Sequence, residues 1–491
     1  MSDLPLGWAT SPIGDLIELT PKNETGDDTI VGFVPMPLMG TGFLEPIRYE
    51  TKRWSEVKKG YTHFADGDVL LAKITPCFEN GKAGIACNLP NGIGAGSTEY
   101  FVCRPKSGAV VAKYLLAFFK TRDFMRGGEV NMTGSVGHKR VPKDYLLGSE
   151  MPLAPLSEQK RIADKLDSLL ARADAARARL DRIPELLKRF RQSVLAAATS
   201  GQLTEDWRKE NATISVEEYL GGLSLLKEKL VSDKKIKKDL VFRPIKGIAG
   251  GIPVQWSNVS IASICSKITD GEHLTPNRTT VGKFLLSARN VTNSGIKLKD
   301  VDFVDEEEFK KLRGRCDPNI GDILISCSGS VGRVALVDKD DSYVMVRSAA
   351  MIRPIREFVD IQYVVYALQS PCLQKQIEER SKSTAQANLF LGEIQQLVIA
   401  YPPVEEQREI VRRVGALFAR SEKIEARYNT VRAQVEKLTP SLLAKAFRGE
   451  LVPQVPNDEP ADQLLARLRA TRDSAPPAKR GRKPRQNMEH L

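Results

Sequence analysis

The sequence Pro155-Leu-Ser-Glu-Gln-Lys-Arg-Ile162 occurs a second time, with substitutions, as Pro403-Val-Glu-Glu-Gln-Arg-Glu-Ile410. These phrases open residues 155–203 and 403–451, which align with each other without a gap. A duplication of such long period indicates two copies of one structural unit, related by a pseudo-two-fold axis. Two similar protein faces suit a partner that also has two similar faces, and duplex DNA is the commonest such partner.

Each copy continues as a helical pattern in which apolar residues recur at alternating steps of four and three. This spacing predicts a coiled-coil seam. The predicted seam residues are Ile162, Leu166, Leu169, Leu180 and Leu187 in the first copy, and Ile410, Val414, Leu417, Tyr428 and Val435 in the second. The alternative is two amphipathic helices, each packed on its own domain; the narrow seam and the charged outer faces favour the coiled coil. Pro184 and Pro440 predict a kink or a break in each helix.

Length and composition limit the possible classes of protein. A chain of 491 residues is too long for one core and predicts two or more domains. The formal net charge of +12 favours an anionic partner such as nucleic acid, although part of the excess lies in a Pro/Ala-rich C-terminal tail. The seven cysteines never show Cys-x-x-Cys spacing, the sequence has no long apolar segment, and Met1-Ser-Asp-Leu-Pro-Leu does not have the charged and apolar regions that are typical of a secretory signal. We therefore expect a soluble cytoplasmic protein without a membrane segment or a metal site.

Two β-rich regions, residues 1–154 and 251–402, precede the two helical segments. Weaker repeats connect them: Gly67-Asp-Val-Leu-Leu71 corresponds to Gly321-Asp-Ile-Leu-Ile325, and Arg104-Pro105 corresponds to Arg353-Pro354. The alignment between the two regions drifts, which indicates insertions and deletions in loops, where recognition residues commonly lie. The predicted fold is α+β, with two β-rich domains (1–154 and 251–402), a central helix (155–203), a distal helix (403–451), a short helix with a basic linker (204–250), and a short helix with a disordered basic tail (452–491).

Several phrases occur in a characteristic order: Ile268-Thr-Asp-Gly-Glu-His-Leu-Thr-Pro276, Gly321-Asp-Ile-Leu-Ile-Ser-Cys-Ser-Gly-Ser-Val-Gly-Arg333, Thr384-Ala-Gln-Ala-Asn388, Pro402-Pro-Val-Glu-Glu-Gln407 and Ala444-Lys-Ala-Phe-Arg-Gly-Glu-Leu451. With the duplicated helices, they resemble the specificity subunit of type I restriction–modification systems over nearly the whole chain. The first β-rich region departs more from this pattern. Its Lys73-Ile-Thr-Pro-Cys-Phe-Glu-Asn80 replaces the Ser/Gly loop of the second, which suits a domain that reads a different sequence.

The resemblance implies that each β-rich domain is a target recognition domain that reads one half of a split site in double-stranded DNA. It also implies that the two spacer helices pack antiparallel and set the unread gap between the half-sites. The expected partners are two modification subunits, which carry S-adenosylmethionine and methylate adenine, and restriction subunits, which use ATP and magnesium to translocate and cut DNA. The chain itself is then a non-catalytic subunit that binds no cofactor and no membrane.

Lys and Arg side chains grip phosphates, whereas Arg, Asn, Gln, His, Ser and Thr read base edges. Polar loop residues of both domains are therefore candidate DNA-binding residues. In the first domain they are Lys73, Thr75, Asn80, Lys82, Ser135, His138, Lys139 and Arg140. In the second they are Thr269, His273, Thr275, Arg278, Arg289, Asn290, Ser328, Ser330, Arg333, Gln386 and Asn388. The alternative for each residue is a solvated loop position or a turn cap.

Two other functions remain open: a DNA-binding protein with its own adenine methyltransferase activity, and a coiled-coil scaffold that does not bind DNA. The sequence contains no Gly-x-x-x-x-Gly-Lys-Ser/Thr phosphate loop and no Asn/Asp-Pro-Pro-Tyr motif, which Tyr401-Pro-Pro-Val404 resembles only superficially. The four histidines show no metal-ligand spacing, so neither catalytic residues nor metal ligands are predicted. An enzyme would methylate DNA without another subunit, and a scaffold would show no salt-dependent retention on DNA.

Overall fold

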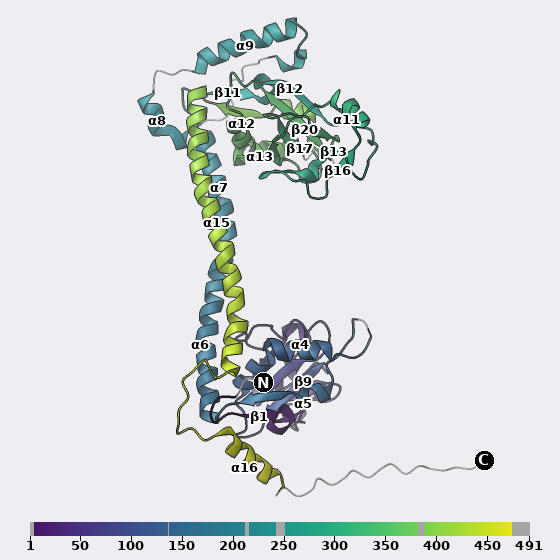
Figure 1. Ribbon diagram of the computed structural model, residues 1–491, viewed down its shortest axis with the longest axis vertical. Coiled ribbons are helices and arrows are strands. Elements are labelled where there is room, and N and C mark those ends of the chain that lie inside the picture. Colours follow the sequence, from purple (N-terminus) through teal and green to yellow (C-terminus); the bar gives the residue numbers. More distant parts are fainter. Residues whose placement is uncertain (1–3, 136, 212–215, 242–250, 382–386, 474–491) are drawn as a thin grey trace, which may run out of the picture. The chain divides into compact units, whose positions relative to one another are not determined.

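The computed structural model describes residues 4–135, 137–211, 216–241, 251–381 and 387–473 (Figure 1). The chain divides into two units, Met1–Asp181 with Asn429–Leu491, and Arg182–Tyr428. Each unit contains one β-rich domain and the helical segments that adjoin it, so the chain is α+β with a repeated domain. Among the residues described, no helix is both long enough and apolar enough to cross a membrane.

The domain of the first unit is built from two four-stranded sheets and a strand pair. The first sheet has the order β2 (Ile17–Leu19), β9 (Tyr100–Pro105), β6 (Val69–Ala72), β7 (Ala83–Ile85). The second has the order β4 (Glu50–Arg53), β3 (Ile30–Val34), β8 (Ile93–Gly96), β5 (Thr62–Ala65), in which β3 and β8 are parallel. The strand pair is β1 (Ala9–Pro12) with β10 (Glu150–Leu153). The helices are α1 (Ile13–Leu16), α2 (Trp54–Val57), α3 (Ala112–Phe119), α4 (Arg122–Val130) and α5 (Lys143–Gly148).

The domain of the second unit repeats this topology. Its four-stranded sheet has the order β12 (Cys265–Asp270), β20 (Ala349–Pro354), β17 (Ile323–Ser326), β18 (Val334–Leu336). Its three-stranded sheet has the order β16 (Asp302–Val304), β13 (Lys283–Leu286), β19 (Tyr343–Met345), again with a parallel pair, β13 and β19. The strand pairs are β11 (Ser257–Ser260) with β21 (Val398–Tyr401), and β14 (Val291–Thr292) with β15 (Gly295–Ile296). The helices are α10 (Ile261–Ile264), α11 (Glu306–Arg313), α12 (Ile361–Gln369), α13 (Pro371–Ser381) and α14 (Leu391–Gln395).

The two long helical segments differ in continuity. The first consists of α6 (Leu156–Leu180) and α7 (Ile183–Ser200), and Pro184 lies in the first turn of α7, where a proline is tolerated. The second is a single helix of 44 residues, α15 (Val404–Phe447), which continues through Pro440. A break at Pro440 is therefore wrong, whereas a break beside Pro184 is observed. A proline removes only one backbone donor, and a long helix can keep its remaining hydrogen bonds.

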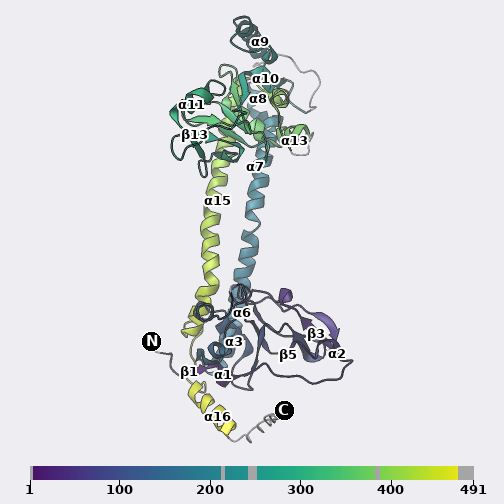
Figure 2. The same ribbon diagram turned by 90° about the vertical axis from the view of Figure 1, so that its right-hand side faces the viewer.

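The predicted seam is only partly reproduced. Ile162, Leu166, Ile410, Val414, Tyr428 and Val435 are buried, whereas Leu169, Leu180, Leu187 and Leu417 are half-buried. In the first unit Leu170 is buried in place of Leu169, because the start of α6 packs on α3 of its own domain (Figure 2). Leu170 belongs to a buried cluster that also contains Leu443 near the end of α15. The alternative of helices packed on their own domains thus applies to the first turns of α6.

Within the second unit, α7 and the first half of α15 run antiparallel. Val194, Leu195 and Ala198 near the end of α7 belong to one buried cluster with Ile410 and Val414 near the start of α15. Earlier in α7, the Arg191 guanidinium lies 3.2 Å from the Glu425 carboxylate, farther along α15. Contacts that advance along one helix while retreating along the other define the antiparallel direction. The local pairing therefore agrees with the expected antiparallel coiled coil.

A short helix from outside the β-rich segment also packs on each domain. In the second unit α9 (Val216–Ser232) packs on the core through Val216 and Leu223, after the short α8 (Glu205–Glu210). In the first unit α16 (Ala461–Asp473) packs through Ala461 and Leu464. Most of the predicted basic linker, residues 242–250, and the basic tail, residues 474–491, lie outside the described residues.

Candidate nucleic-acid interface

The loops that carry most of the candidate residues of the second domain meet at one end of its four-stranded sheet. β12 and β17 end there, and β20 and β18 begin there, because Asp270 pairs with Ala350, Ser326 with Ala349, and Ile325 with Val334. This end, called the loop edge below, therefore gathers residues 271–282, 327–333 and 346–348. In the first domain the loops at residues 73–82 and 97–99 lie at the same end of the corresponding sheet, since Ala72 pairs with Tyr100.

The opposite end of each sheet is held by a bidentate ion pair. In the second domain Arg353 donates from Nε to Asp322 Oδ1 at 2.8 Å and from Nη2 to Oδ2 at 2.7 Å. In the first domain Arg104 makes the same two bonds to Asp68, both at 2.8 Å. Both aspartates are buried. The repeated Gly-Asp and Arg-Pro phrases thus form a structural anchor, and the varied loops are left at the other end.

At the loop edge of the first domain, the structure brings together two loops that lie far apart in the sequence. The backbone N–H of Val141 donates to the carbonyl of Lys73 at 2.8 Å, and Thr75 N–H donates to the Lys139 carbonyl at 2.9 Å. Ser135, His138, Lys139 and Arg140 are exposed on the second loop. The Arg140 guanidinium donates to both carboxylate oxygens of Glu99, at 2.9 and 2.7 Å, and these bonds hold the pKa of Glu99 below its usual range.

The second domain repeats this frame with other side chains. The Leu389 N–H donates to the carbonyl of Cys327 at 2.8 Å, and Ser328 is bridged to Asn388. Ser330 is exposed and Arg333 is half-buried on the same loop as Ser328. The same backbone contact therefore joins the two loops in both domains, although the side chains on these loops differ. Gln386 lies outside the described residues.

A polar cluster continues the loop edge of the second domain beyond β12. Asp270 accepts from Arg315 Nη2 at 2.7 Å and contacts His273 Nε2 at 2.8 Å. Burial opposes ionisation of Asp270, but the hydrogen bonds from Arg315 and His273 outweigh it and lower the pKa of this carboxyl. Arg315 also lies 2.9 Å from His273 Nε2, a nitrogen that can serve only one of its two partners at a time.

The remaining candidate residues do not occupy equivalent positions in the two domains. Thr275 and Asn80 are exposed, and Thr269 is half-buried in β12. Arg278 and Arg289 both approach the carboxylate of Asp302, at 3.5 and 2.9 Å. Each of these residues remains a predicted DNA contact.

Two candidates are better explained by internal contacts. Asn290 is 1% exposed; its side-chain oxygen accepts from Ser287 N–H at 3.0 Å, and its side-chain nitrogen donates to the Lys297 carbonyl at 2.9 Å. It is a turn cap, the alternative that the sequence left open. The Lys82 ammonium donates to the Met36 carbonyl at 2.9 Å, which ties it to its own domain.

Two arginines, one within the loop edge and one beside it, were not predicted from the sequence. Arg315 follows α11 and joins the cluster around Asp270, and Arg347 is exposed in the loop between β19 and β20. The backbone carbonyl of Ser348, next to Arg347, accepts a hydrogen bond from the Cys327 N–H at 2.8 Å. In the first domain the backbone carbonyl of Glu99 accepts from the Lys73 N–H at 2.9 Å in the same way. Arg347 therefore corresponds to Thr98 of the first domain. No sequence phrase marks either arginine; only the strand order places them beside the other candidates.

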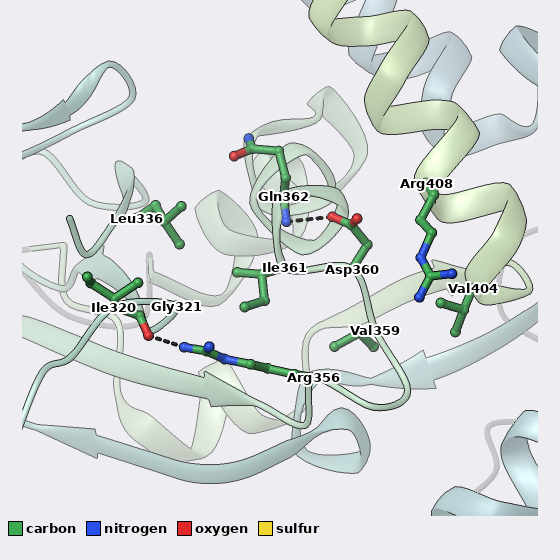
Figure 3. A pocket seen from close by; sticks show the side chains of 10 residues that line it. All are labelled: Ile320, Gly321, Leu336, Arg356, Val359, Asp360, Ile361, Gln362, Val404 and Arg408. Atoms are coloured by element: carbon green, nitrogen blue, oxygen red, sulfur yellow. Dashed lines mark hydrogen bonds between the residues drawn. The ribbon is translucent and has the colours of Figure 1, made fainter. Parts of the chain in front are cut away.

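A hollow in the second unit lies away from the loop edge (Figure 3). It is lined by Gly321 and Arg356 from the anchored end of the sheet, by Asp360 at the start of α12, and by Arg408 from α15. Asp360 accepts from the Gln362 N–H at 2.9 Å and so caps α12. The hollow thus belongs to the contact between the domain and its helices. Among the described residues, no cluster of His, Cys, Asp and Glu side chains is suited to hold a metal ion.

The chain thus carries two β-rich domains of similar topology, each with an equivalent loop edge. Residues 5–185 and 253–433 each match the family model of the type I restriction modification DNA specificity domain, and the chain belongs to this family. The chain is 28% identical to the type I restriction enzyme EcoAI specificity subunit of Escherichia coli, over 86% of this chain and 79% of that protein. It is 32% identical to the EcoBI specificity subunit of Escherichia coli, over 72% of this chain and 70% of that protein.

Solved structures show the same fold. The HsdS subunit from Thermoanaerobacter tengcongensis matches with a TM-score of 0.58 and 18% identity, over 91% of this chain and 98% of that chain. A chain from a structure on complex assembly and conformational transition of the type I R-M system matches with a TM-score of 0.62 and 18% identity, over 92% and 100% of the two chains. At this identity the likeness concerns the fold alone.

The loop-edge arginines give a first prediction. Arg347→Ala should weaken DNA binding by the assembled complex about 10- to 100-fold, because a base or phosphate contact by arginine is worth about 1–3 kcal/mol. The measurement is a titration with labelled target DNA at several salt concentrations. Arg356→Ala is the matched control, since Arg356 is also exposed but lies at the anchored end of the same sheet. Equal losses in the two variants, or no loss in Arg347→Ala, would show that the loop edge does not bind DNA.

Proposed function

We propose that this chain is the DNA sequence-recognition subunit of a type I restriction–modification enzyme, in which each β-rich domain reads one half of a bipartite target. The observation that carries this proposal is the pair of loop edges, which share one backbone frame and present different side chains. Where the first domain has Thr98 and Arg140, the second has Arg347 and Asn388 at the corresponding places. One scaffold with two sets of polar side chains is suited to read two different base sequences.

The other components of the enzyme would supply its chemistry. The relatives are named as specificity subunits of type I restriction enzymes, and one structural neighbour comes from a structure on the assembly of such a system. We propose that the chain joins two modification subunits, which carry S-adenosylmethionine and methylate adenine, and restriction subunits, which use ATP and magnesium. In this proposal the chain itself is non-catalytic and its contribution is the choice of DNA sequence.

The test uses the purified chain with and without its modification subunits. Labelled S-adenosylmethionine and genomic DNA are added, and both methyl transfer and salt-dependent retention on DNA are measured. We expect methyl transfer only in the complex, together with retention that falls as salt rises. Methyl transfer by the chain alone would favour a DNA-binding methyltransferase. A complex without salt-dependent retention would favour a coiled-coil scaffold.

A further inference from the structure

Each domain meets its spacer helix at a joint that contains one buried tryptophan–glutamate contact. The Trp8 indole N–H donates to Glu158 Oε2 at 3.1 Å in the first unit, and the Trp256 indole N–H donates to Glu406 Oε2 at 2.7 Å in the second. Each glutamate lies in the first turn of its helix and is 1% exposed. The contact therefore connects the residue before the first strand of each domain, β1 or β11, to the first turn of the spacer helix.

The next residue of each helix, Gln159 or Gln407, joins two further segments. The Gln159 side-chain oxygen accepts the N–H of Val111, which precedes α3, at 3.0 Å, and its side-chain nitrogen donates to the Ala154 carbonyl, after β10, at 2.9 Å. Gln407 makes the equivalent two bonds: its side-chain oxygen accepts the Asp360 N–H at 2.8 Å, and its side-chain nitrogen donates to the Pro402 carbonyl at 2.9 Å. Both glutamine side chains are fully buried.

The Glu-Gln pair thus contacts the start of the domain, its last strand and the start of one of its helices. Buried polar groups that lose their partners destabilise a structure, so another orientation of the domain on the helix would leave several such groups unsatisfied. The same set of bonds appears in both units, although the sequences of the two domains have diverged. This repetition identifies the contacts as a property of the joint.

We propose that the Glu-Gln pair at the start of each spacer helix is a positioning element, which fixes the orientation of its recognition domain and so restricts the gap between the two half-sites. This inference rests on the proposed function. A rotation of one domain at its joint would move its loop edge along the DNA, where successive bases of a strand lie about 3.4 Å apart. A loosened joint should therefore widen the range of gap lengths without changing the bases that are read.

The two joints differ in one respect. Glu406 Oε1 also accepts from Thr204 Oγ1 at 2.7 Å and from Arg208 Nε at 3.0 Å. Glu158 Oε1 is buried and has no hydrogen-bond partner among the described residues, and burial raises the pKa of this carboxyl. Replacing the carboxylate with an amide should therefore disturb the second joint more than the first.

The experiment measures methylation by the complete complex on DNA duplexes that carry the native half-sites and gaps that are native, one base pair shorter or one base pair longer. For Gln159→Ala and Gln407→Ala we expect the preference for the native gap to fall about tenfold, as loss of a buried hydrogen bond predicts. The half-site sequences should stay the same. Lys160→Ala is the control for Gln159→Ala, because Lys160 follows Gln159 and is exposed, and Arg420→Ala, at an exposed position farther along α15, is the control for Gln407→Ala.

Unchanged gap preference in folded glutamine variants would overturn the inference, while methylation of a bipartite site by the wild-type complex would leave the proposed function intact. A wild-type complex that methylates no bipartite site would instead contradict the proposed function. If the alanine variants do not fold, the same assay of gap preference is carried out with Glu158→Gln and Glu406→Gln. We expect Glu406→Gln to relax the gap preference and Glu158→Gln to change it less, and wild-type behaviour of both would overturn the inference.

Discussion

Replacing residues 9–153 with the corresponding segment of a relative is expected to change one half of the methylated sequence and to leave the other half and the gap unchanged. The segment runs from β1 to β10 and contains the complete first loop edge. It leaves Trp8 and Glu158 in place, so this contact of the joint is retained. Loops on a retained scaffold can change recognition without changing the frame. The readout is the adenine methylation pattern of DNA exposed to the chimeric complex.

The matched exchange is residues 257–401, from β11 to β21, which should change the other half of the sequence alone. Together the two chimeras assign each half-site to one domain. If either exchange altered both halves, the two domains would read DNA jointly. If the gap changed in both chimeras, the spacing would depend on the domains themselves.

The substitution Asp322→Ala is expected to destabilise the second unit by about 3 kcal/mol, because it removes the buried carboxylate of an ion pair and deprives the Arg353 guanidinium of two of its hydrogen bonds. Asp322 is 3% exposed and receives two hydrogen bonds from Arg353, which would keep only its contacts with Asp317. Hydrogen exchange measured peptide by peptide should show lost protection in β17 and β20.

The control for this variant is Glu185→Ala, which removes an exposed ion pair with Arg189 in α7. Such surface pairs contribute less than about 1 kcal/mol. If Asp322→Ala lost no more stability than Glu185→Ala, the Gly-Asp and Arg-Pro phrases would not be the anchor of the sheet. Asp68→Ala should produce the corresponding loss in β6 and β9 of the first unit.

The sequence predicted the duplicated framework well, because a gapless repeat directly reports two equivalent helices and their junctions with two domains. It could not predict that Asp322 pairs with Arg353, or Glu406 with Trp256, since such partners meet only when the strands and helices assemble. The heptad pattern placed Leu169 in the seam, although Leu170 is buried, because a repeat of four and three assumes that a helix packs only on another helix.

The residues of the loop edges were harder to predict, because the chemistry of a side chain does not show where that side chain lies in the folded domain. Asn290 has the right chemistry for reading a base, yet its amide caps a turn. Arg347 lies in a short connection without a recognisable phrase, and its place beside Ser328 follows from the pairing of β17 with β20. Lys73 and Thr75 were proposed separately from Lys139 and Arg140, and the backbone hydrogen bonds between residues 73–75 and 139–141 place all four on one surface.

Site-specific crosslinking can show whether each loop edge contacts its own half-site. A photoreactive amino acid is placed at position 98 or 347, which are exposed and equivalent in the two domains. The complex is bound to a duplex that carries the methylated motif, and the crosslinked nucleotides are then mapped. We expect position 98 to react with one half-site and position 347 with the other. Crosslinks from both positions to the same half-site, or from neither to DNA, would contradict this expectation.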